Sequence, residues 1–279
     1  MYWHFFKLER APFALSPDPY FLCPTAAHEE ALARLYYGIQ QRLGCLMLTG
    51  EVGTGKTLMA RCLLERLQAQ GLAFSYIFDP RLRRSEFWRF VLHDLGLELP
   101  EKDQAERLLR LQTFLIARHR LGQTTVLVVD EAQQLPWSLL EEIRLLTNLE
   151  TPRHKLLQVI LLGQPELERQ LNQPRLRQLR QRISLRCRLM PLTPAETREY
   201  ILRRLERAGA DPRAAAGWFT AETSEAIQQA SGGIPRLINL LCDQALLAAY
   251  ARQQRRVDSA QVAEIATEMQ LQAMETTAA

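Results

Sequence analysis

The sequence lacks any apolar run that approaches the roughly 20 residues with which a helix crosses a bilayer. Its first residues, Met1-Tyr-Trp-His-Phe-Phe-Lys7, mix aromatic and charged side chains and lack the apolar core of a signal peptide. We therefore expect no direct insertion into a membrane and predict a cytoplasmic protein. Any association with a membrane would then go through a partner protein.

Cysteine is scarce, and neither sign of charge dominates. The five cysteines are scattered and form no C-x-x-C pair, which favours a reduced protein over a disulfide framework or a zinc site. The 35 basic and 31 acidic side chains leave a formal charge of +4, which alone predicts neither a nucleic-acid nor a membrane partner. Apolar residues are plentiful, 47% of 279, enough for one large domain and a small one.

Apolar runs of strand length alternate with helical patterns before Pro191. Strands are expected at 45–49, 73–78, 126–129, 157–162 and, half exposed, 184–189. Helices are expected at 56–70, 85–95, 104–120, 137–149 and 174–182. Such alternation is typical of a parallel sheet between helices. We predict an α/β fold with a five-stranded parallel sheet and helices on both faces.

After Pro191 the strand pattern stops and helical patterns continue. Thr193 and Glu196 stand at the spacing of a capping box, with Pro194 at the first helical position. Helices are expected at 195–208, 221–231 and 235–251, with a short one after Asp258. This part is therefore predicted to be an all-helical lid.

The segment Gly50-Glu-Val-Gly-Thr-Gly-Lys-Thr57 matches G-x-x-x-x-G-K-[ST] between an expected strand and an expected helix. Glycines let backbone N–H groups curl around phosphates, and the helix N-terminus adds partial positive charge. Lys56 should reach the β- and γ-phosphates of ATP, and Thr57 should bind Mg²⁺. The predicted nucleotide contacts are Gly50, Val52, Gly53, Thr54, Gly55, Lys56 and Thr57, the alternative being a glycine-rich turn without a ligand.

A second motif, Val126-Leu-Val-Val-Asp-Glu131, is an apolar strand that ends in two carboxylates. Ligands of open α/β sheets bind at the carboxyl ends of the strands. We predict that Asp130 holds Mg²⁺, mainly through water, and that Glu131 polarises the attacking water. An acidic pair here favours an ATPase over a GTPase, which generally positions water with glutamine. The chain between the motifs leaves room for a strand inserted between the two motif strands.

Read in order with their flanks, these motifs resemble the ExeA/GspA group of AAA+ ATPases, which includes the pilus-biogenesis ATPase MshM. The resemblance covers about residues 2–268. The segments that carry it are Phe5-Phe-Lys-Leu8, Pro12-Phe13, Pro17-Asp-Pro19, Phe21-Leu22, His28, Ala31-Leu32, Tyr37-Gly-Ile39, Gly50–Thr57, Val129-Asp-Glu-Ala-Gln133, Gly163-Gln-Pro-Glu-Leu167, Gln181-Arg-Ile183 and Gly232-Gly-Ile-Pro-Arg236.

The resemblance implies an AAA+ protein that binds and hydrolyses ATP with Mg²⁺ as an ATP-dependent homo-oligomer. It also implies a protein partner in a secretion or type IV pilus-like assembly system, with peripheral attachment to the inner membrane through that partner as one option. The longest members are understood to carry a transmembrane helix and a peptidoglycan-binding domain after the ATPase. We therefore expect either a short member of MshM type or part of a longer protein.

The predicted domains follow the change of pattern near residue 191. They are a nucleotide-binding domain at 1–191 with an N-terminal segment 1–40, a helical lid at 192–270 and a flexible tail at 271–279.

The resemblance also assigns roles to single polar residues. Gln164 matches sensor 1, whose side chain orients the attacking water; alternatively, it fixes the turn before Pro165. Arg236 matches sensor 2, which brings the lid onto the γ-phosphate; alternatively, it is a solvent-exposed arginine at a helix start. Tyr36, Tyr37 and Ile39 either line the adenine pocket or belong to the core.

Arg182 matches the region of the arginine finger, which stabilises transition-state charge at a neighbouring subunit. The stretch 175–188 holds six arginines and no acid, and its apolar residues predict a buried stripe at helical spacing. The arginines should therefore face solvent or a partner. A merely solvated basic face is the alternative, and Arg180 and Arg177 are the next candidates for the finger.

Two further classes of function fit parts of the sequence. A DNA-binding transposition regulator of TnsC-like type shares the core and its motif order, and Arg81-Leu-Arg-Arg84 or the arginines of 175–188 could meet DNA phosphates. The near-neutral charge argues against this alternative. A signalling switch that binds ATP with little turnover is disfavoured by the intact Glu131.

The two motifs predict separable defects. Lys56→Ala should abolish ATP binding because it removes the cation that meets the phosphates. Glu131→Gln should still bind ATP but stop turnover because the amide cannot activate water. Titration with a fluorescent nucleotide beside a phosphate-release assay measures both effects. Full turnover by Glu131→Gln would refute the assignment of Glu131 as the base.

Overall fold

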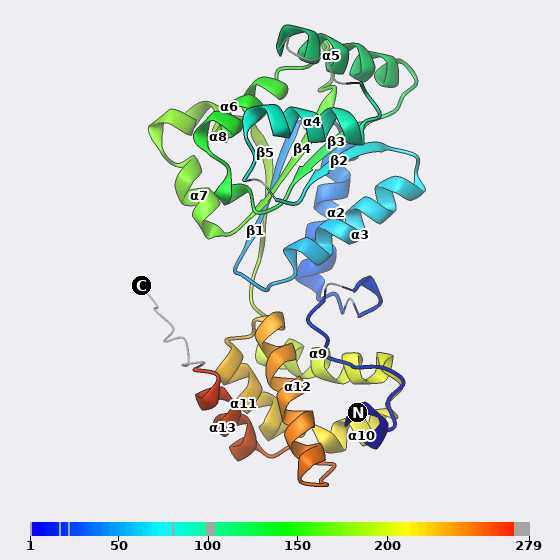
Figure 1. The fold of residues 1–279 in the computed structure, drawn as a ribbon, viewed down its shortest axis with the longest axis vertical. Coiled ribbons are helices and arrows are strands. Elements are labelled where there is room, and N and C mark those ends of the chain that lie inside the picture. The colour runs from blue at the N-terminus through cyan, green and yellow to red at the C-terminus, as the bar shows by residue number, and fades with distance from the viewer. Residues whose placement is uncertain (1, 17, 22, 80, 99–103, 271–279) are drawn as a thin grey trace. The chain divides into compact units, whose positions relative to one another are not determined.

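The computed structural model describes residues 2–16, 18–21, 23–79, 81–98 and 104–270. The chain divides into two compact units, which Figure 1 shows as an α/β unit and a helical unit. The sheet unit comprises Ala26–Gly50 and Lys56–Leu189. The helical unit comprises the described residues of Met1–Thr25, Glu51–Gly55 and Met190–Ala279.

Five strands form one sheet in the order β2-β3-β4-β1-β5, and every neighbouring pair is parallel. This confirms the predicted α/β fold with a five-stranded parallel sheet. The strands are β1 (Cys45–Gly50), β2 (Ala73–Ile77), β3 (Thr125–Val129), β4 (Leu157–Gly163) and β5 (Ile183–Leu189).

The strand between the two motif strands is β4, which follows both motifs in the sequence, whereas β2 lies at the edge of the sheet. β4 pairs in parallel with β1 on one side and with β3 on the other. Parallel strands all have their carboxyl ends on the same side of the sheet. The residues at these ends therefore come together there. They are Gly50 at the end of β1, Asp130 after β3 and Gln164 after β4.

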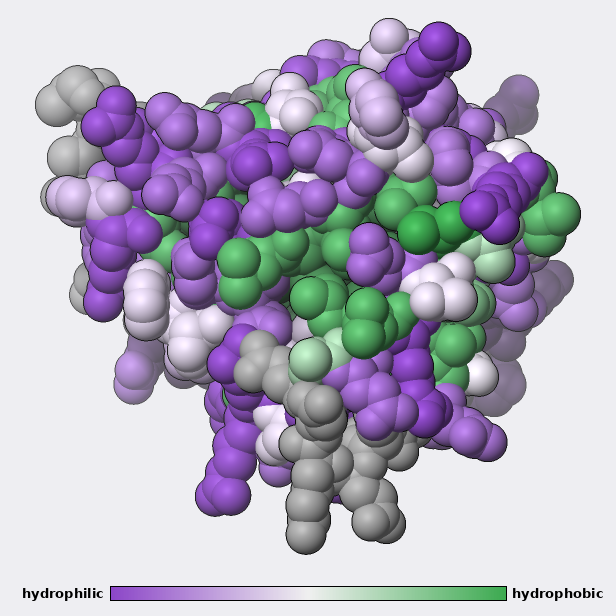
Figure 2. Space-filling model, turned by 90° about the horizontal axis from the view of Figure 1, so that it is seen from above, coloured by the Kyte–Doolittle hydropathy of each residue, from purple (hydrophilic) through white to green (hydrophobic). Residues whose placement is uncertain are grey.

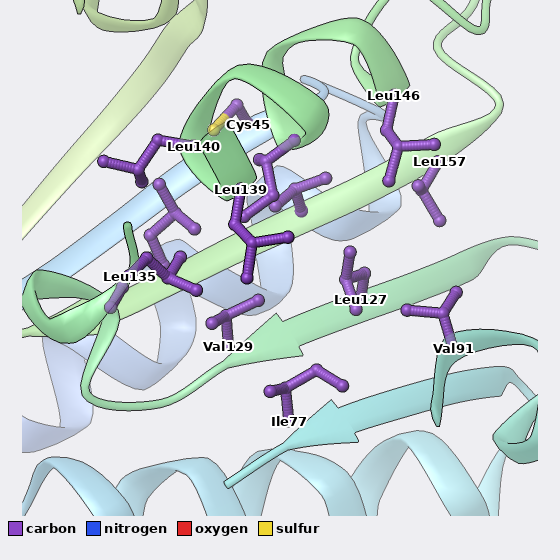
Figure 3. Packing of buried hydrophobic residues seen from close by; sticks show 14 of the residues in the cluster. Cys45, Ile77, Val91, Leu127, Val129, Leu135, Leu139, Leu140, Leu146 and Leu157 are labelled. Atoms are coloured by element: carbon purple, nitrogen blue, oxygen red, sulfur yellow. The ribbon is translucent and has the colours of Figure 1, made fainter. Parts of the chain in front are cut away.

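Strand side chains alternate between two apolar cores because successive residues point to opposite faces of a sheet. On one face, Leu127 and Val129 pack with residues of α6 (Trp137–Leu146), as Figure 3 shows. On the other face, Val126 and Val128 pack with α2 (Ala26–Gln40) and α3 (Lys56–Ala69). Helices therefore cover both faces of the sheet, as predicted.

Four further helices belong to the sheet unit. They are α4 (Arg84–Asp94), α5 (Gln104–Arg120), α7 (Pro165–Leu171) and α8 (Arg177–Arg182). α5 buries Leu111 and Leu115 but leaves Leu108 and Leu109 exposed. Figure 2, which views the molecule from above, shows a band of apolar residues between polar ones. Within the described ranges, no helix is long and apolar enough to cross a membrane.

The helix α7 is absent from the sequence prediction. It begins directly after Gln164, with Pro165 at its first position, and buries Leu167 and Leu171. The expected helix 174–182 is a 3-10 turn followed by α8. A run of seven residues is too short to show helical periodicity clearly, which explains the omission.

The helical unit contains five helices besides the short α1 (Tyr2–Phe5) in its described residues. They are α9 (Pro194–Arg207), α10 (Pro212–Trp218), α11 (Ala221–Ser231), α12 (Pro235–Ala251) and α13 (Ser259–Glu268). The capping box of Thr193 and Glu196 is confirmed at the start of α9. The predicted tail 271–279 lies outside the described residues, and the predicted domain limits stay a prediction.

The aromatic start of the chain packs into the core of the helical unit. Phe6 is 1% exposed, and its ring meets that of Trp218 with 5.0 Å between centroids. The buried guanidinium of Arg204 donates to the carbonyl oxygen of Pro12 at 2.6 Å. The predicted nucleotide-binding domain includes these first residues, whereas in the structure they lie against C-terminal helices.

Two glycines end α11 and lead into α12. Gly232 has φ +58° and caps α11, with open space where a side chain would start. Gly233 has φ +74°, and a Cβ there would lie 2.2 Å from the carbonyl oxygen of Leu192. The backbone N–H of Leu192 donates to the carbonyl oxygen of Gly233 at 2.8 Å. The second glycine is therefore required both by its backbone conformation and by the close approach of Leu192.

Substitution by alanine should separate these effects. Gly232→Ala should cost about 1–2 kcal/mol in the free energy of unfolding, because only the left-handed backbone opposes it. Gly233→Ala should cost more, because its Cβ also collides with a backbone oxygen. Gly217→Ala within α10 is the control and should be neutral or stabilising, by up to ~1 kcal/mol. Urea unfolding measures all three, and equal losses at residues 232 and 233 would contradict the steric argument.

Candidate nucleotide-binding site

The motif Gly50–Thr57, predicted to bind phosphates and called the phosphate-binding motif below, ends in the first turn of α3. Lys56 is 5% exposed, and its Nζ donates to the carbonyl oxygen of Gly50 at 2.8 Å. Between these two residues, Val52 is exposed and Gly55 has φ +98°. A buried ammonium group beside the N-terminus of a long helix favours phosphate, because the helix dipole and its first N–H groups add positive charge.

The middle of the motif, Glu51–Gly55, belongs to the helical unit. Gly53 has φ +84°, and a Cβ there would lie 2.7 Å from the Cβ of Arg236. The backbone N–H of Arg236 donates to the carbonyl oxygen of Gly53 at 3.2 Å, and the hydroxyl of Thr54 donates to that of Glu51 at 2.8 Å. Glycine is thus needed at position 53 both for the turn of the motif and for the approach of Arg236, in the first turn of α12.

Asp130 directly follows β3 and is 3% exposed. Its Oδ2 accepts hydrogen bonds from the hydroxyls of Thr57 at 2.8 Å and Tyr76 at 3.1 Å, and its Oδ1 accepts from the backbone N–H of Glu131 at 2.9 Å. Burial and the Asp130 carboxylate raise the pKa of Tyr76, so its hydroxyl stays protonated and donates. Three donors satisfy a carboxylate that would be costly to bury alone.

Glu131 has φ 50°, in the left-handed region that residues other than glycine seldom adopt. Its Oε2 accepts from the side-chain amides of Gln133 at 2.6 Å and Gln164 at 3.1 Å. The Oε1 of Gln133 in turn accepts the backbone N–H of Gln164 at 3.1 Å. We call Gln133 and Gln164 the amide clamp, since together they fix one oxygen of Glu131.

Gly163, at the end of β4, makes room for the amide clamp. A Cβ at this position would lie 3.0 Å from Oε1 of Gln133 and 2.8 Å from a methyl group of Leu167. A larger residue would therefore displace either the clamp or the packing of α7. The residue before Gln164 thus has a steric reason to be glycine.

The side chains present fit ATP and Mg²⁺. Thr57 and Asp130 offer a hydroxyl and a carboxylate 2.8 Å apart, and oxygen atoms are the ligands that Mg²⁺ prefers. Among the described residues, no three His, Cys, Asp or Glu side chains cluster as a metal cage would require. The pair therefore suits a metal that is bound together with phosphates and water, and the buried ammonium group of Lys56 suits a phosphate.

Arg182 lies at the opposite end of the sheet from this site. Ile183, the next residue, pairs with Cys45 at the start of β1, whereas Gly50 at the end of β1 pairs with Leu189. At about 3.3 Å per residue, this register separates Arg182 from Gly50 by roughly 20 Å. The pKa of Glu150 is held below its usual value mainly by Lys155, and the charge of Arg182 contributes to that shift.

The residues considered for the adenine pocket differ in their surroundings. The hydroxyl of Tyr36 donates to Gln70, just beyond the end of α3 that is opposite Lys56, and Arg66 stacks on its ring at 4.2 Å. Ile39 is fully buried in the core between the sheet and α3. Ile39 therefore belongs to the core, whereas Tyr36 is half-buried at the surface and Tyr37 is exposed.

Two residues of this site were not assigned a role from the sequence. Gln133 was quoted only as part of Val129-Asp-Glu-Ala-Gln133, and Tyr76 only as part of an expected strand. Their contacts depend on which strands are neighbours, and the sequence does not fix that order. The one available signal is their position. Tyr76 lies near the carboxyl end of an expected strand, and Gln133 lies two residues after Glu131, so both are polar groups near the side of the sheet where ligands bind.

The five-stranded parallel sheet and the C-terminal helices have the AAA+ fold. Residues 39–171 match the family described as AAA domain. Over 259 residues, the chain is 44% identical to general secretion pathway protein A of Aeromonas hydrophila. The matched region covers 92% of this chain and 46% of that protein. This similarity confirms the resemblance to the ExeA/GspA group, and the chain spans just under half of that relative's length.

Solved structures share the fold at low sequence identity. Cdc6p of Pyrobaculum aerophilum superposes with a TM-score of 0.66 at 18% identity, covering 88% of this chain and 67% of that one. The ORC1 protein of Aeropyrum pernix, solved in complex with DNA, superposes with a TM-score of 0.65 at 23% identity, covering 94% and 70%. These likenesses confirm the AAA+ fold with a C-terminal helical region.

The amide clamp generates a prediction about turnover. Gln133→Ala should leave ATP affinity unchanged and lower turnover about tenfold, the effect of one hydrogen bond to a charged group. Gln134→Ala is the matched control, since that neighbouring side chain is exposed. Steady-state phosphate release and nucleotide titration give the two quantities. An equal loss in both variants, or a loss of affinity alone, would argue against the clamp.

Proposed function

We propose that the chain binds ATP with Mg²⁺ and hydrolyses it as a homo-oligomer, and that it assists the assembly of a secretion or type IV pilus-like machine. The observation that carries the proposal is the pair of carboxylates at the end of β3. Asp130 is bonded to Thr57 of the phosphate-binding motif, and Glu131 is fixed beside it by the amide clamp. The relationship to general secretion pathway protein A supports the process.

The residues divide the work of hydrolysis by position. Lys56 and the backbone N–H groups of the motif bind the phosphates, and Thr57 with Asp130 would hold Mg²⁺. The metal would neutralise charge that develops on the β- and γ-phosphates. Because two amides occupy Oε2 of Glu131, we assign Oε1 as the oxygen that accepts the hydrogen bond of the attacking water.

Gln164 and Arg236 are proposed to monitor the γ-phosphate. Gln164 reaches Glu131 from the end of β4, so one amide can touch both the carboxylate and the attacking water. Arg236 lies in the first turn of α12, and its backbone N–H donates to the carbonyl oxygen of Gly53. A change in that turn on binding ATP would therefore reach the helices that follow residue 190.

Arg182 is proposed to act on the ATP of a neighbouring subunit. It is partly exposed and is separated from its own phosphate-binding motif by the length of β5. An arginine finger contributes about 10³–10⁵-fold to turnover in other nucleotide hydrolases. The proposed oligomer is cytoplasmic and reaches the inner membrane, where it does so, through a protein partner.

The DNA-binding alternative receives less support from one of its two basic segments. Arg81 forms an ion pair with Asp79 at 3.0 Å, and Arg84 forms one with the buried Glu142. These carboxylates offset charge that would otherwise attract DNA phosphates. The arginines of 175–188 remain the surface on which this alternative depends.

Complementation between two inactive variants tests the proposal. Arg182→Ala and Glu131→Gln should each bind ATP and hydrolyse it poorly. Mixed oligomers would contain some interfaces that join an intact Glu131 to an intact Arg182, so activity should partly return. A phosphate-release assay at increasing mixing ratios measures this.

The exposed Arg175 provides the control for that experiment. Arg175→Ala should keep wild-type turnover, and a mixture of Lys56→Ala with Glu131→Gln should stay inactive, because neither subunit type has a complete site. Wild-type turnover by Arg182→Ala would move the role to Arg180 or Arg177. Inactive mixtures that co-assemble would refute action on a neighbouring subunit.

A further inference from the structure

Tyr76 is the third donor to Asp130, and the function proposed above does not use it. Its hydroxyl donates to Oδ2 of Asp130 at 3.1 Å, the same oxygen that accepts from Thr57 at 2.8 Å. Oδ1 is bonded to the backbone N–H of Glu131. Both carboxylate oxygens are therefore held, and Tyr76 is the donor among the three that comes from the edge strand β2.

The ring of Tyr76 is placed by contacts that do not involve the nucleotide site. Its backbone N–H donates to Oδ2 of Asp94 at 3.0 Å, and the same carboxylate oxygen accepts from the hydroxyl of Ser75 at 2.9 Å. Asp94 ends α4, so the strand and this helix are joined next to the tyrosine. In the sheet, Tyr76 pairs with Val128, two residues before Asp130. The hydroxyl thus reaches the carboxylate from a rigid part of the fold.

A phenylalanine would fill the same volume, so packing alone does not require the hydroxyl. Asp130 is 3% exposed, and a buried carboxylate oxygen that loses a donor is left less stable and freer to rotate. Thr57 is the other donor to Oδ2, and its oxygen is also a proposed ligand of Mg²⁺. Tyr76 is the donor of that pair that would not itself bind the metal.

We propose, on the basis of the proposed ATP·Mg site, that Tyr76 is a positioning residue for the metal: its hydroxyl fixes the Asp130 carboxylate beside Thr57. It touches neither the nucleotide nor the reacting atoms in this role. The hydroxyl of Tyr76 should therefore raise the affinity for Mg²⁺ and leave the affinity for the nucleotide without metal unchanged.

The test measures binding, not only activity. A fluorescent ATP analogue is titrated onto the wild-type protein and Tyr76→Phe, first in EDTA and then at rising Mg²⁺ concentrations. Tyr76→Phe should bind the analogue equally well in EDTA but need about tenfold more Mg²⁺ for half of the metal-dependent gain in affinity, the effect of one hydrogen bond to a charged group. Tyr250→Phe, in the helical unit, is the matched control and should shift nothing.

A double-mutant cycle separates positioning from a general structural effect. Asp130→Asn should itself raise the Mg²⁺ requirement, and adding Tyr76→Phe to it should cause little further shift, because the hydroxyl acts through the carboxylate. Equal shifts in both backgrounds would overturn the proposal, as would a loss of affinity in EDTA. Melting of Tyr76→Phe should stay cooperative, at a somewhat lower temperature than that of the wild type, because the buried carboxylate loses one donor.

The outcomes also distinguish this inference from the function on which it rests. A wild-type protein whose nucleotide affinity ignores Mg²⁺ would overturn the proposed function and the role of Tyr76 with it. A wild-type protein that responds to Mg²⁺, beside an unshifted Tyr76→Phe, would overturn the role of Tyr76 alone.

Discussion

The buried carboxylate of Asp130 is the point on which the rest of the site depends. It directly follows β3 and accepts hydrogen bonds from Thr57 in α3, from Tyr76 in β2 and from the backbone N–H of Glu131. A carboxylate with so little exposure is stable only while these donors stay in place. A shift of any of the three segments would remove a donor. The geometry of the proposed metal site therefore depends on the packing that holds these segments in place.

Much of the fold could be predicted because buried parallel strands have a simple signature. Each expected strand is present within about one residue, since runs such as Val126-Leu-Val-Val129 fill both faces of a covered sheet. The start of α9 was predictable for a different reason, because Thr193 and Glu196 satisfy backbone groups locally. Signals that depend on neighbouring residues were thus visible in the sequence.

Features that depend on distant residues were not visible. The first residues of the chain belong to the helical core because Phe6 meets Trp218, more than two hundred positions away. Tyr76 and Gln133 join the site only because β2 and β4 both adjoin β3, an order that the sequence left open. The motif residues were found because their spacing repeats across nucleotide-binding proteins, whereas these supporting residues follow no such spacing.

The polarity of the sheet also bears on why an oligomer is proposed. In a parallel sheet, the carboxyl ends of all strands, with their ligand-binding groups, lie on one side, and the amino ends of all strands lie on the opposite side. Glu131 and Lys56 lie at the carboxyl ends of the strands, whereas Arg182 precedes β5 at the amino ends. One subunit cannot bring its own Arg182 to its own phosphates without breaking β5 away from β1. A head-to-tail contact between copies joins the two sides without any change of fold, and such heterologous contacts close into rings or extend into filaments.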